Sequence, residues 1–202
     1  MSNVNSHKMR DSDDPMSTAQ APNPKNFFAL FGFEPSFDID CDHLETAYIQ
    51  ESAKWHPDQN PHASSREKMQ RTLFMATLND AYKALKSPLD RGYHLLSLHA
   101  PELCADQEQT IKDPELLQEA LEDQETLDEI HSADQLEGFY EAAQSKYDHV
   151  LTIISAAFHN KNYQEARLFL YRLRYYQKVL KDAQAKRSQL KHSQPENQLQ
   201  SS

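Results

Sequence analysis

Glycine is scarce in this chain, and that scarcity limits the folds open to it more than any other feature. Only three of the 202 residues are glycine. Sheet-rich folds need many tight turns, in which glycine adopts backbone conformations that other residues avoid. Leu, Ala, Gln, Glu and Lys, which favour helices, dominate the chain instead. The composition therefore predicts an all-α protein.

Two stretches in the first half, residues 40–55 and 65–86, carry apolar side chains at helical spacing. The face of the first stretch consists of Leu44, Ala47, Tyr48, Ser52 and Trp55. The face of the second consists of Phe74, Leu78, Ala81, Tyr82 and Leu85. Each face is expected to be buried, so the two stretches are predicted to form an antiparallel helical hairpin. The preceding segment NFFALFGF is predicted to form a short helical turn that Gly32 ends.

The segment WHPDQNP, residues 55–61, lies between these two helices. Pro57 disfavours helical geometry at His56, so the first helix is expected to end there. Asp40 or Asp42 is predicted to cap the first helix, and Ser64 or Ser65 the second. Taken alone, a His-Pro-Asp tripeptide is most simply interpreted as a helix stop and a turn.

The second half of the chain shows a shift in charge. Residues 101–141 contain 14 acidic residues and one base, whereas residues 161–191 contain nine bases and two acidic residues. Such blocks favour a helical unit in which an acidic helix pairs with a basic one. Three helices are predicted at about 113–131, 134–159 and 162–187, after a shorter helix that ends near Ala100 and Pro101.

The acidic helix has one apolar face that suffices for a core, formed by Leu116, Ala120, Leu127 and Ile130. Leu117 and Leu121 lie outside that face. They adjoin a fan of polar side chains, namely Gln118, Glu122, Glu125 and Glu129. An apolar patch with a charged rim is typical of a protein-binding site. The alternative, that the two leucines pack against another helix of the same domain, is equally compatible with the periodicity.

The ends of the chain are polar and lack apolar periodicity, so they are predicted to be disordered tails. The expected organisation is a tail at 1–25, a first domain at 26–100, a linker at 101–112, a second domain at 113–187 and a tail at 188–202. The sequence contains no apolar run of 18 residues and no N-terminal leader, which predicts a soluble, unexported protein.

Several kinds of function are disfavoured by composition. The formal charge of −10 argues against nucleic acid as a partner, because such proteins neutralise phosphates with Lys and Arg. Cys41 and Cys104 are far apart and form no CxxC pair, so the reducing cytoplasm is the expected location. The ten histidines show no metal-ligand spacing, and no phosphate loop or nucleophile motif occurs. The chain is therefore expected to have no catalytic activity and no cofactor of its own.

Several motifs together resemble a known family. WHPDQ between two amphipathic helices, followed by LNDAYKALKSPLDRGYHLL, resembles the J domain of DnaJ-type co-chaperones. FFALFGF, YHLLSLH and LLQEALEDQETLDEI resemble HscB, the J-domain co-chaperone of bacterial iron–sulfur cluster assembly. The likeness covers about residues 26–185. It implies an L-shaped protein with an N-terminal J domain and a C-terminal three-helix bundle domain.

The resemblance also implies two partners. In that family the His-Pro-Asp loop docks on an HscA-type, DnaK-like chaperone and stimulates its ATPase, which assigns the chaperone contact to His56, Pro57 and Asp58, with Lys54 beside them. The C-terminal domain holds the scaffold protein IscU, to which the iron–sulfur cluster belongs. The positions implied for that contact are Leu117, Gln118, Leu121, Glu122, Glu125, Glu129 and, from the last helix, Tyr175. A monomer is expected.

The sequence departs from the family pattern near the loop. Gln59 stands where relatives often have Lys, and residues 40–55 contain four carboxylates against Lys54 alone. Because J-domain second helices usually present a basic face, weak charge steering toward the chaperone is expected. Arg66, Lys68 and Arg71 remain as further positive contacts.

Two other functions compete with this interpretation. The first is a general J-domain folding co-chaperone. The sequence has no Gly/Phe-rich linker and no zinc-type cysteine repeats, which argues against this function. The second is a non-catalytic helical adaptor in which His-Pro-Asp has no role, an alternative that the acidic helix before the loop supports.

Overall fold

The computed structural model describes residues 25–56, 63–104 and 113–193, and within these ranges it contains helices and no strand. The helices are α2 (Phe27–Leu30), α3 (Cys41–Trp55), α4 (Ser65–Lys86), α5 (Pro88–His99), the 3₁₀ helix η2 (Pro101–Cys104), α6 (Pro114–Glu129), α7 (Ala133–His159) and α8 (Tyr163–Ser193). The prediction of an all-α protein is confirmed.

Caps define where the two hairpin helices begin. The carboxylate of Asp40 accepts two backbone N–H groups in the first turn of α3. Ser64 and Glu67 form a reciprocal capping box at the start of α4. These side chains satisfy N–H groups that lack partners inside the helix, so they fix each helix start. Of the two candidates predicted for each cap, the structure selects Asp40 over Asp42 and Ser64 over Ser65.

The apolar faces predicted for α3 and α4 meet inside the hairpin. The hydroxyl of Tyr48 donates to the side chain of Asn79 at 2.8 Å, and its ring stacks on Tyr82 with centroids 4.3 Å apart. The fully or almost fully buried members are Leu44, Trp55, Leu78, Ala81 and Leu85. The predicted antiparallel hairpin is therefore confirmed.

The short helix α2 is attached to the first arm by His94 of α5. The backbone N–H of Phe27 donates to Nε2 of His94 at 3.0 Å, and the two rings stack with centroids 4.3 Å apart. Gly32 follows α2 with φ of 74°, a left-handed conformation that favours glycine. The prediction that Gly32 ends this turn is confirmed.

The contact between His94 and Phe27 makes the free energy of unfolding depend on pH. Burial lowers the pKa of His94 below its ordinary 6.5, and Nε2 must be unprotonated to accept the N–H of Phe27. As pH falls through about 6.5, His94 becomes protonated in the unfolded chain but not yet in the folded chain. The free energy of unfolding therefore decreases toward acid pH. We expect urea denaturation at pH 7.5 and 5.5 to show a larger difference for the wild type than for His94→Leu. Equal differences would contradict this role.

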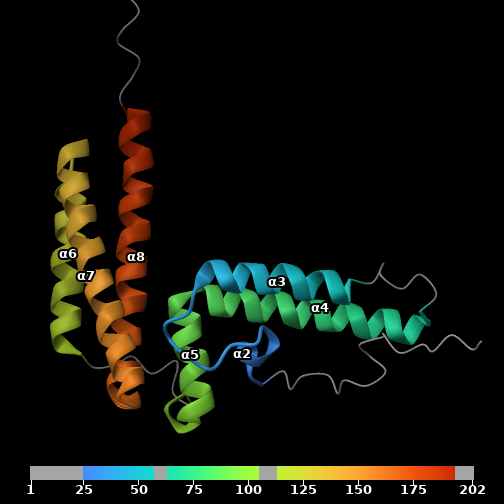
Figure 1. Cartoon of the computed structure of the whole chain (residues 1–202). Helices are drawn as coiled ribbons and strands as arrows, with labels where there is room; N and C mark the ends of the chain where they lie inside the picture. The colour runs from blue at the N-terminus through green and yellow to red at the C-terminus, as the bar shows by residue number, and fades with distance from the viewer. Residues whose placement is uncertain (1–24, 57–62, 105–112, 194–202) are drawn as a thin grey trace, which may run out of the picture.

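Helices α6, α7 and α8 form a bundle, which is the second arm (Figure 1). Their bounds lie within a few residues of those predicted, except that α8 continues to Ser193 instead of ending at 187. Residues 188–193 are therefore helical, and the predicted tail was placed too early. The reason is tertiary, because Leu190 packs on the cluster of Leu127 and Leu136 near the end of the bundle.

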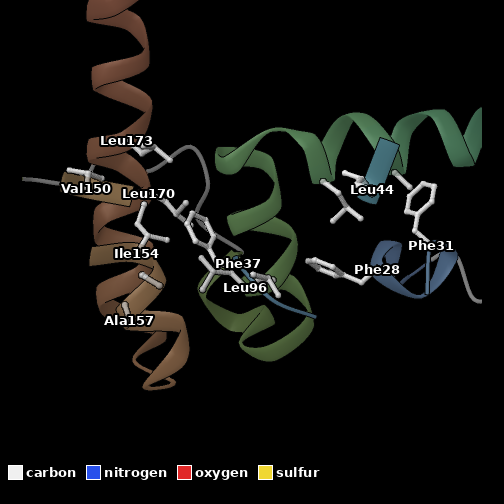
Figure 2. Close-up of a cluster of buried hydrophobic side chains, with 14 of the residues drawn as sticks. Phe28, Phe31, Phe37, Leu44, Leu96, Val150, Ile154, Ala157, Leu170 and Leu173 are labelled. Atoms are coloured by element: carbon white, nitrogen blue, oxygen red, sulfur yellow. The ribbon is translucent and has the colours of Figure 1, made fainter. Parts of the chain in front are cut away.

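The two arms meet at an angle and form an L, with α5 between the hairpin and α8 (Figure 1). One continuous apolar core crosses the junction. Figure 2 shows Phe37 and Leu96 between the bundle residues Ile154 and Leu170 on one side and Phe28 on the other. Such a buried, close-packed junction holds the arms in a fixed orientation.

Gly92 allows α5 and α8 to approach closely. A Cβ atom on Gly92 would lie 2.4 Å from Cδ2 of Leu170, which is fully buried. We therefore expect Gly92→Val to lower the free energy of unfolding by about 2 kcal/mol through overpacking. Gly138, where an added Cβ meets no atom within 4 Å, supplies the matched control Gly138→Val. Chemical denaturation measures both, and a Gly92→Val protein as stable as the control would contradict the close contact.

Candidate partner-binding surfaces

The end of α3 carries the first candidate surface. His56 is the exposed C-cap residue of α3, with backbone φ of −57° and ψ of 133°. That extended geometry is the one that a following proline imposes, so His56 ends the helix as predicted. Pro57 and Asp58 lie outside the described residues.

The base of this surface is held by buried aromatic and cationic side chains. Trp55 packs against Phe74 of α4 with ring centroids 4.3 Å apart. The guanidinium of Arg71 lies over the Trp55 ring and donates to the backbone carbonyl of Lys54 at 3.3 Å. The last carbonyls of an α-helix have no N–H partner within the helix, so the Arg71 guanidinium caps the end of α3. His56 thus extends from an anchored turn.

The structure corrects the list of positive contacts near His56. Arg71 is only 4% exposed, so the prediction that it offers its charge to a partner is wrong. Its guanidinium is needed inside the hairpin, where it meets Trp55 and the end of α3. Lys54 is exposed, but its Nζ lies 2.6 Å from a carboxylate oxygen of Glu51. Arg66 and Lys68 are exposed in the first turn of α4, so the positive charge available beside His56 comes from α4 and not from α3.

The outer face of α6 is the second candidate surface. Leu117 is 65% exposed and Leu121 is 56% exposed. Gln118, Glu122, Glu125 and Glu129 are also exposed, and the amide of Gln118 donates to Glu122 at 2.7 Å. The alternative in which the two leucines pack against another helix of this domain is excluded. Together these six residues are called the α6 outer face below.

The opposite side of α6 packs as the periodicity predicted. Leu127 and Ile130 are buried, and Leu116 and Ala120 are partly buried. A helix that buries one apolar side and still presents two more leucines to solvent has apolar area that its own domain does not use. The assignment of the α6 outer face to a partner stays a prediction.

Polar contacts between helices fix the orientation of α6. The hydroxyl of Tyr176 on α8 donates to Glu119 at 2.9 Å, and Nζ of Lys146 on α7 lies 2.6 Å from the same carboxylate. Burial opposes the charge of Lys146, but Glu119 and Asp123 outweigh it and raise the pKa of Lys146. Burial and the bond to Glu119 raise the pKa of Tyr176, so its hydroxyl stays a donor.

The first turn of α6 is fixed by Asp113. Its carboxylate accepts the backbone N–H of Leu116 at 3.1 Å and the Arg172 guanidinium of α8 at 2.7 Å. Burial acts to raise the pKa of Asp113, yet these two hydrogen bonds lower it overall. One residue therefore caps α6 and connects it to α8.

Tyr175 lies apart from the two exposed leucines. It is half-buried, and its hydroxyl donates to Asp123 at 2.6 Å. Asp123 is about 120° around the helix from Leu117 and about 160° from Leu121, at 100° per residue. The expected position of Tyr175 beside the leucines is not observed, because the hydroxyl finds a carboxylate on the other edge of α6. Its part in scaffold binding stays a prediction.

The sequence interpretation missed the group that orients α6, which consists of Asp113, Glu119, Asp123, Lys146 and Arg172. One signal was available, since Glu119 and Asp123 are four residues apart and thus share a face of the helix. The charge blocks predicted a pairing between the acidic helix and the basic α8, which Arg172 makes, but not the partner Lys146 on α7.

Two further properties follow from the described part of the chain. It contains no group of three or more His, Cys, Asp or Glu side chains placed to hold a metal ion. Among its helices none has the length and apolar character needed to cross a membrane.

Comparison with known sequences finds relatives with one shared description. A co-chaperone protein HscB homolog of Shewanella sp. (strain W3-18-1) is 36% identical over 146 residues, which are 71% of this chain and 83% of that relative. A co-chaperone protein HscB homolog of Neisseria meningitidis is 40% identical over 111 residues, which are 55% of this chain and 66% of that relative. The chain thus spans just under two thirds of the Neisseria protein.

A family model and solved structures agree with these relatives. The model described as the HSCB C-terminal oligomerisation domain matches residues 112–184. The crystal structure of human co-chaperone protein HscB superimposes with a TM-score of 0.75 at 29% identity, over 92% of this chain and 94% of the human one. Chaperone HscB from Vibrio cholerae superimposes with a TM-score of 0.72 at 28% identity, over 82% of this chain and 99% of that one.

Proposed function

The chain belongs to the HscB family of co-chaperones, and from that premise we propose that it stimulates the ATPase of an HscA-type, DnaK-like chaperone and delivers an IscU-type scaffold to it. The family fold, a J domain joined to a C-terminal helical bundle, is the one predicted. In this proposal the J domain covers about residues 26–100, 101–112 form the linker, and the bundle from 113 holds the scaffold. The protein acts in the cytoplasm as a monomer, with no catalytic activity or cofactor of its own.

The exposure of Leu117 and Leu121 carries the proposal for the scaffold. Two neighbouring leucines that are more than half exposed, on a helix whose core face is already filled, offer a partner apolar area to bury. The carboxylates at their rim, Glu122, Glu125 and Glu129, favour a partner with basic side chains.

The anchoring of His56 supports the proposal for the chaperone. Trp55 and Arg71 fix the end of α3, so little conformational entropy is lost when His56 contacts a partner. Pro57 and Asp58 complete the motif in the sequence. The positive charge near His56 is supplied by Arg66 and Lys68 on α4, while Lys54 on α3 is paired, so this contact depends on shape and hydrogen bonds as well as on steering.

The decisive experiment is steady-state ATP hydrolysis by a purified HscA-type chaperone with this protein alone, with the IscU-type scaffold alone, and with both. We expect the two together to stimulate more than the sum of their separate effects. No stimulation in any combination would overturn the proposal and favour the helical adaptor. Stimulation without synergy, together with binding of unfolded polypeptide, would instead favour a general folding co-chaperone.

A further inference from the structure

Part of the basic helix α8 does not pair with the acidic helix α6. Of its bases, Arg172 bonds to Asp113 and Lys186 donates to the carbonyl of Asp128. The expected pairing of an acidic with a basic helix is thus made through few side chains. Arg187 pairs with Glu137 of α7, and the remaining cations need another explanation.

Four of those cations form one row. Arg167, Arg174 and Lys181 are spaced seven residues apart, and Lys178 lies between the last two, within about 40–60° of both. In the part of the chain that the structure describes, Lys178 lies 3.4 Å from Asp182, whereas the other three form no salt bridge with a carboxylate. Arg174, Lys178 and Lys181 are exposed. This row is called the inner face of α8 below.

The contacts of α8 show which way this row faces. Arg174 lies over the ring of Tyr93 on α5, with 5.1 Å to the ring centroid. Leu170 faces Gly92 on the same helix. Lys178 and Lys181 are about 12 and 16 Å farther along the axis of α8 than Leu170. The row therefore leaves α5 and continues on the side of α8 toward the first arm.

Figure 1 shows what lies on that side. α3 forms the upper edge of the hairpin, and the part of α8 beyond α5 stands beside it, so the two helices border the open angle of the L. α3 has 15 residues and is about 22 Å long. A domain of about 200 residues is roughly 40 Å across. A partner domain that contacts His56 and lies along α3 is thus wide enough to reach α8.

The charged side chains of α3 supply little positive charge for attracting a partner, whereas the inner face of α8 supplies it. Lys54 is paired with Glu51, and Glu45 lies 3.6 Å from Lys86 of α4. The carboxylate of Asp40 caps the helix. Among the described residues, the cations that border the angle without a carboxylate partner are on α8 and not on α3. Within the angle, positive charge for electrostatic attraction is therefore placed in the second arm, whereas Arg66 and Lys68 supply it at the start of α4.

We propose that the inner face of α8 is a second contact for the DnaK-like chaperone that binds at His56, and that it receives a carboxylate-rich part of that chaperone's surface. This inference rests on the proposed function. It gives the bundle a part in chaperone binding in addition to its role toward the scaffold, which occupies α6. The two roles do not compete, because Arg172 and Lys186 on the α6 side of α8 are about 80–180° from the row.

The test is the double variant Lys178→Glu, Lys181→Glu in the full chain, which leaves Arg174 and its contact with Tyr93 in place. We expect the concentration for half-maximal stimulation of chaperone ATPase to rise about tenfold at low salt and much less at high salt, because rim charges act mainly on encounter. Maximal stimulation should be unchanged, since His56 is intact. Lys178→Arg, Lys181→Arg keeps the charge and should behave as wild type.

Further measurements separate the outcomes. Lys181→Glu alone should raise the half-maximal concentration several-fold. Because this variant creates no new contact with Asp182, it separates the loss of positive charge from a weakening of the helix. If the charge reversal leaves the half-maximal concentration unaltered, the inference is overturned. Stimulation by the wild type would still support the proposed function in that case. A shift confined to scaffold binding, or to self-association in sedimentation, would assign the row to that partner and also overturn it. Absence of stimulation by the wild type would overturn both.

Discussion

His56→Gln is expected to reduce stimulation of the chaperone ATPase to the basal rate, a loss of more than about tenfold. The substitution keeps a side chain of similar length, but a neutral amide cannot reproduce the geometry of the imidazole in a contact that depends on shape and hydrogen bonds. His56 is exposed at the end of α3, so the fold should be unaffected. Steady-state ATP hydrolysis at saturating co-chaperone measures the effect.

Two controls make this result specific. His131→Gln changes another exposed histidine, in the second arm, and should leave stimulation unchanged. Scaffold affinity should be the same in the wild type and in His56→Gln, since the α6 outer face is on the other arm. If His56→Gln lost both activities with an intact fold, the division into two surfaces would be wrong.

The double variant Leu117→Ala, Leu121→Ala is expected to weaken scaffold binding by about 100-fold. Each exposed leucine would lose the free energy of transfer from water to the interface, about 1–2 kcal/mol per side chain. The free energy of unfolding should change by less than about 0.5 kcal/mol, because both side chains are exposed in the free protein. Isothermal titration calorimetry with the scaffold and chemical denaturation measure the two quantities.

Leu73→Ala provides the matched control for this variant. Leu73 is 59% exposed on α4, comparable to Leu121, but belongs to neither surface. It should leave scaffold affinity unchanged. Unaltered binding by the double leucine variant would remove the α6 outer face from the scaffold contact, and a large loss of stability would show that the leucines serve the fold.

The helix faces are the part of the fold that the sequence predicted best. Leu44 and Trp55, Leu78 and Leu85 were assigned to the core from their spacing and are buried. The start of α4 was predicted from its serines. These features depend on side chains within four residues of one another, so the helical repeat and the capping chemistry suffice to predict them.

Residue roles that depend on distant segments were predicted less well. Arg71 was expected at a partner surface and instead caps α3 from α4, 17 residues away. Tyr175 was expected beside Leu117 and Leu121 and instead bonds to Asp123, 52 residues away. The sequence shows the chemistry of each side chain but not which helix stands opposite it.

The helices, their buried faces and the two leucines that the core of α6 does not need follow from the amino-acid sequence, because each depends on local periodicity. The folded structure adds that the leucines stay exposed, that Arg71 is buried, and that Arg174 and Lys181, which have no carboxylate partner among the described residues, border the angle of the L. Those outcomes depend on contacts between helices, such as Arg71 of α4 with the end of α3 and Arg174 of α8 with Tyr93 of α5. Contacts between residues dozens of positions apart leave no periodic trace in the chain.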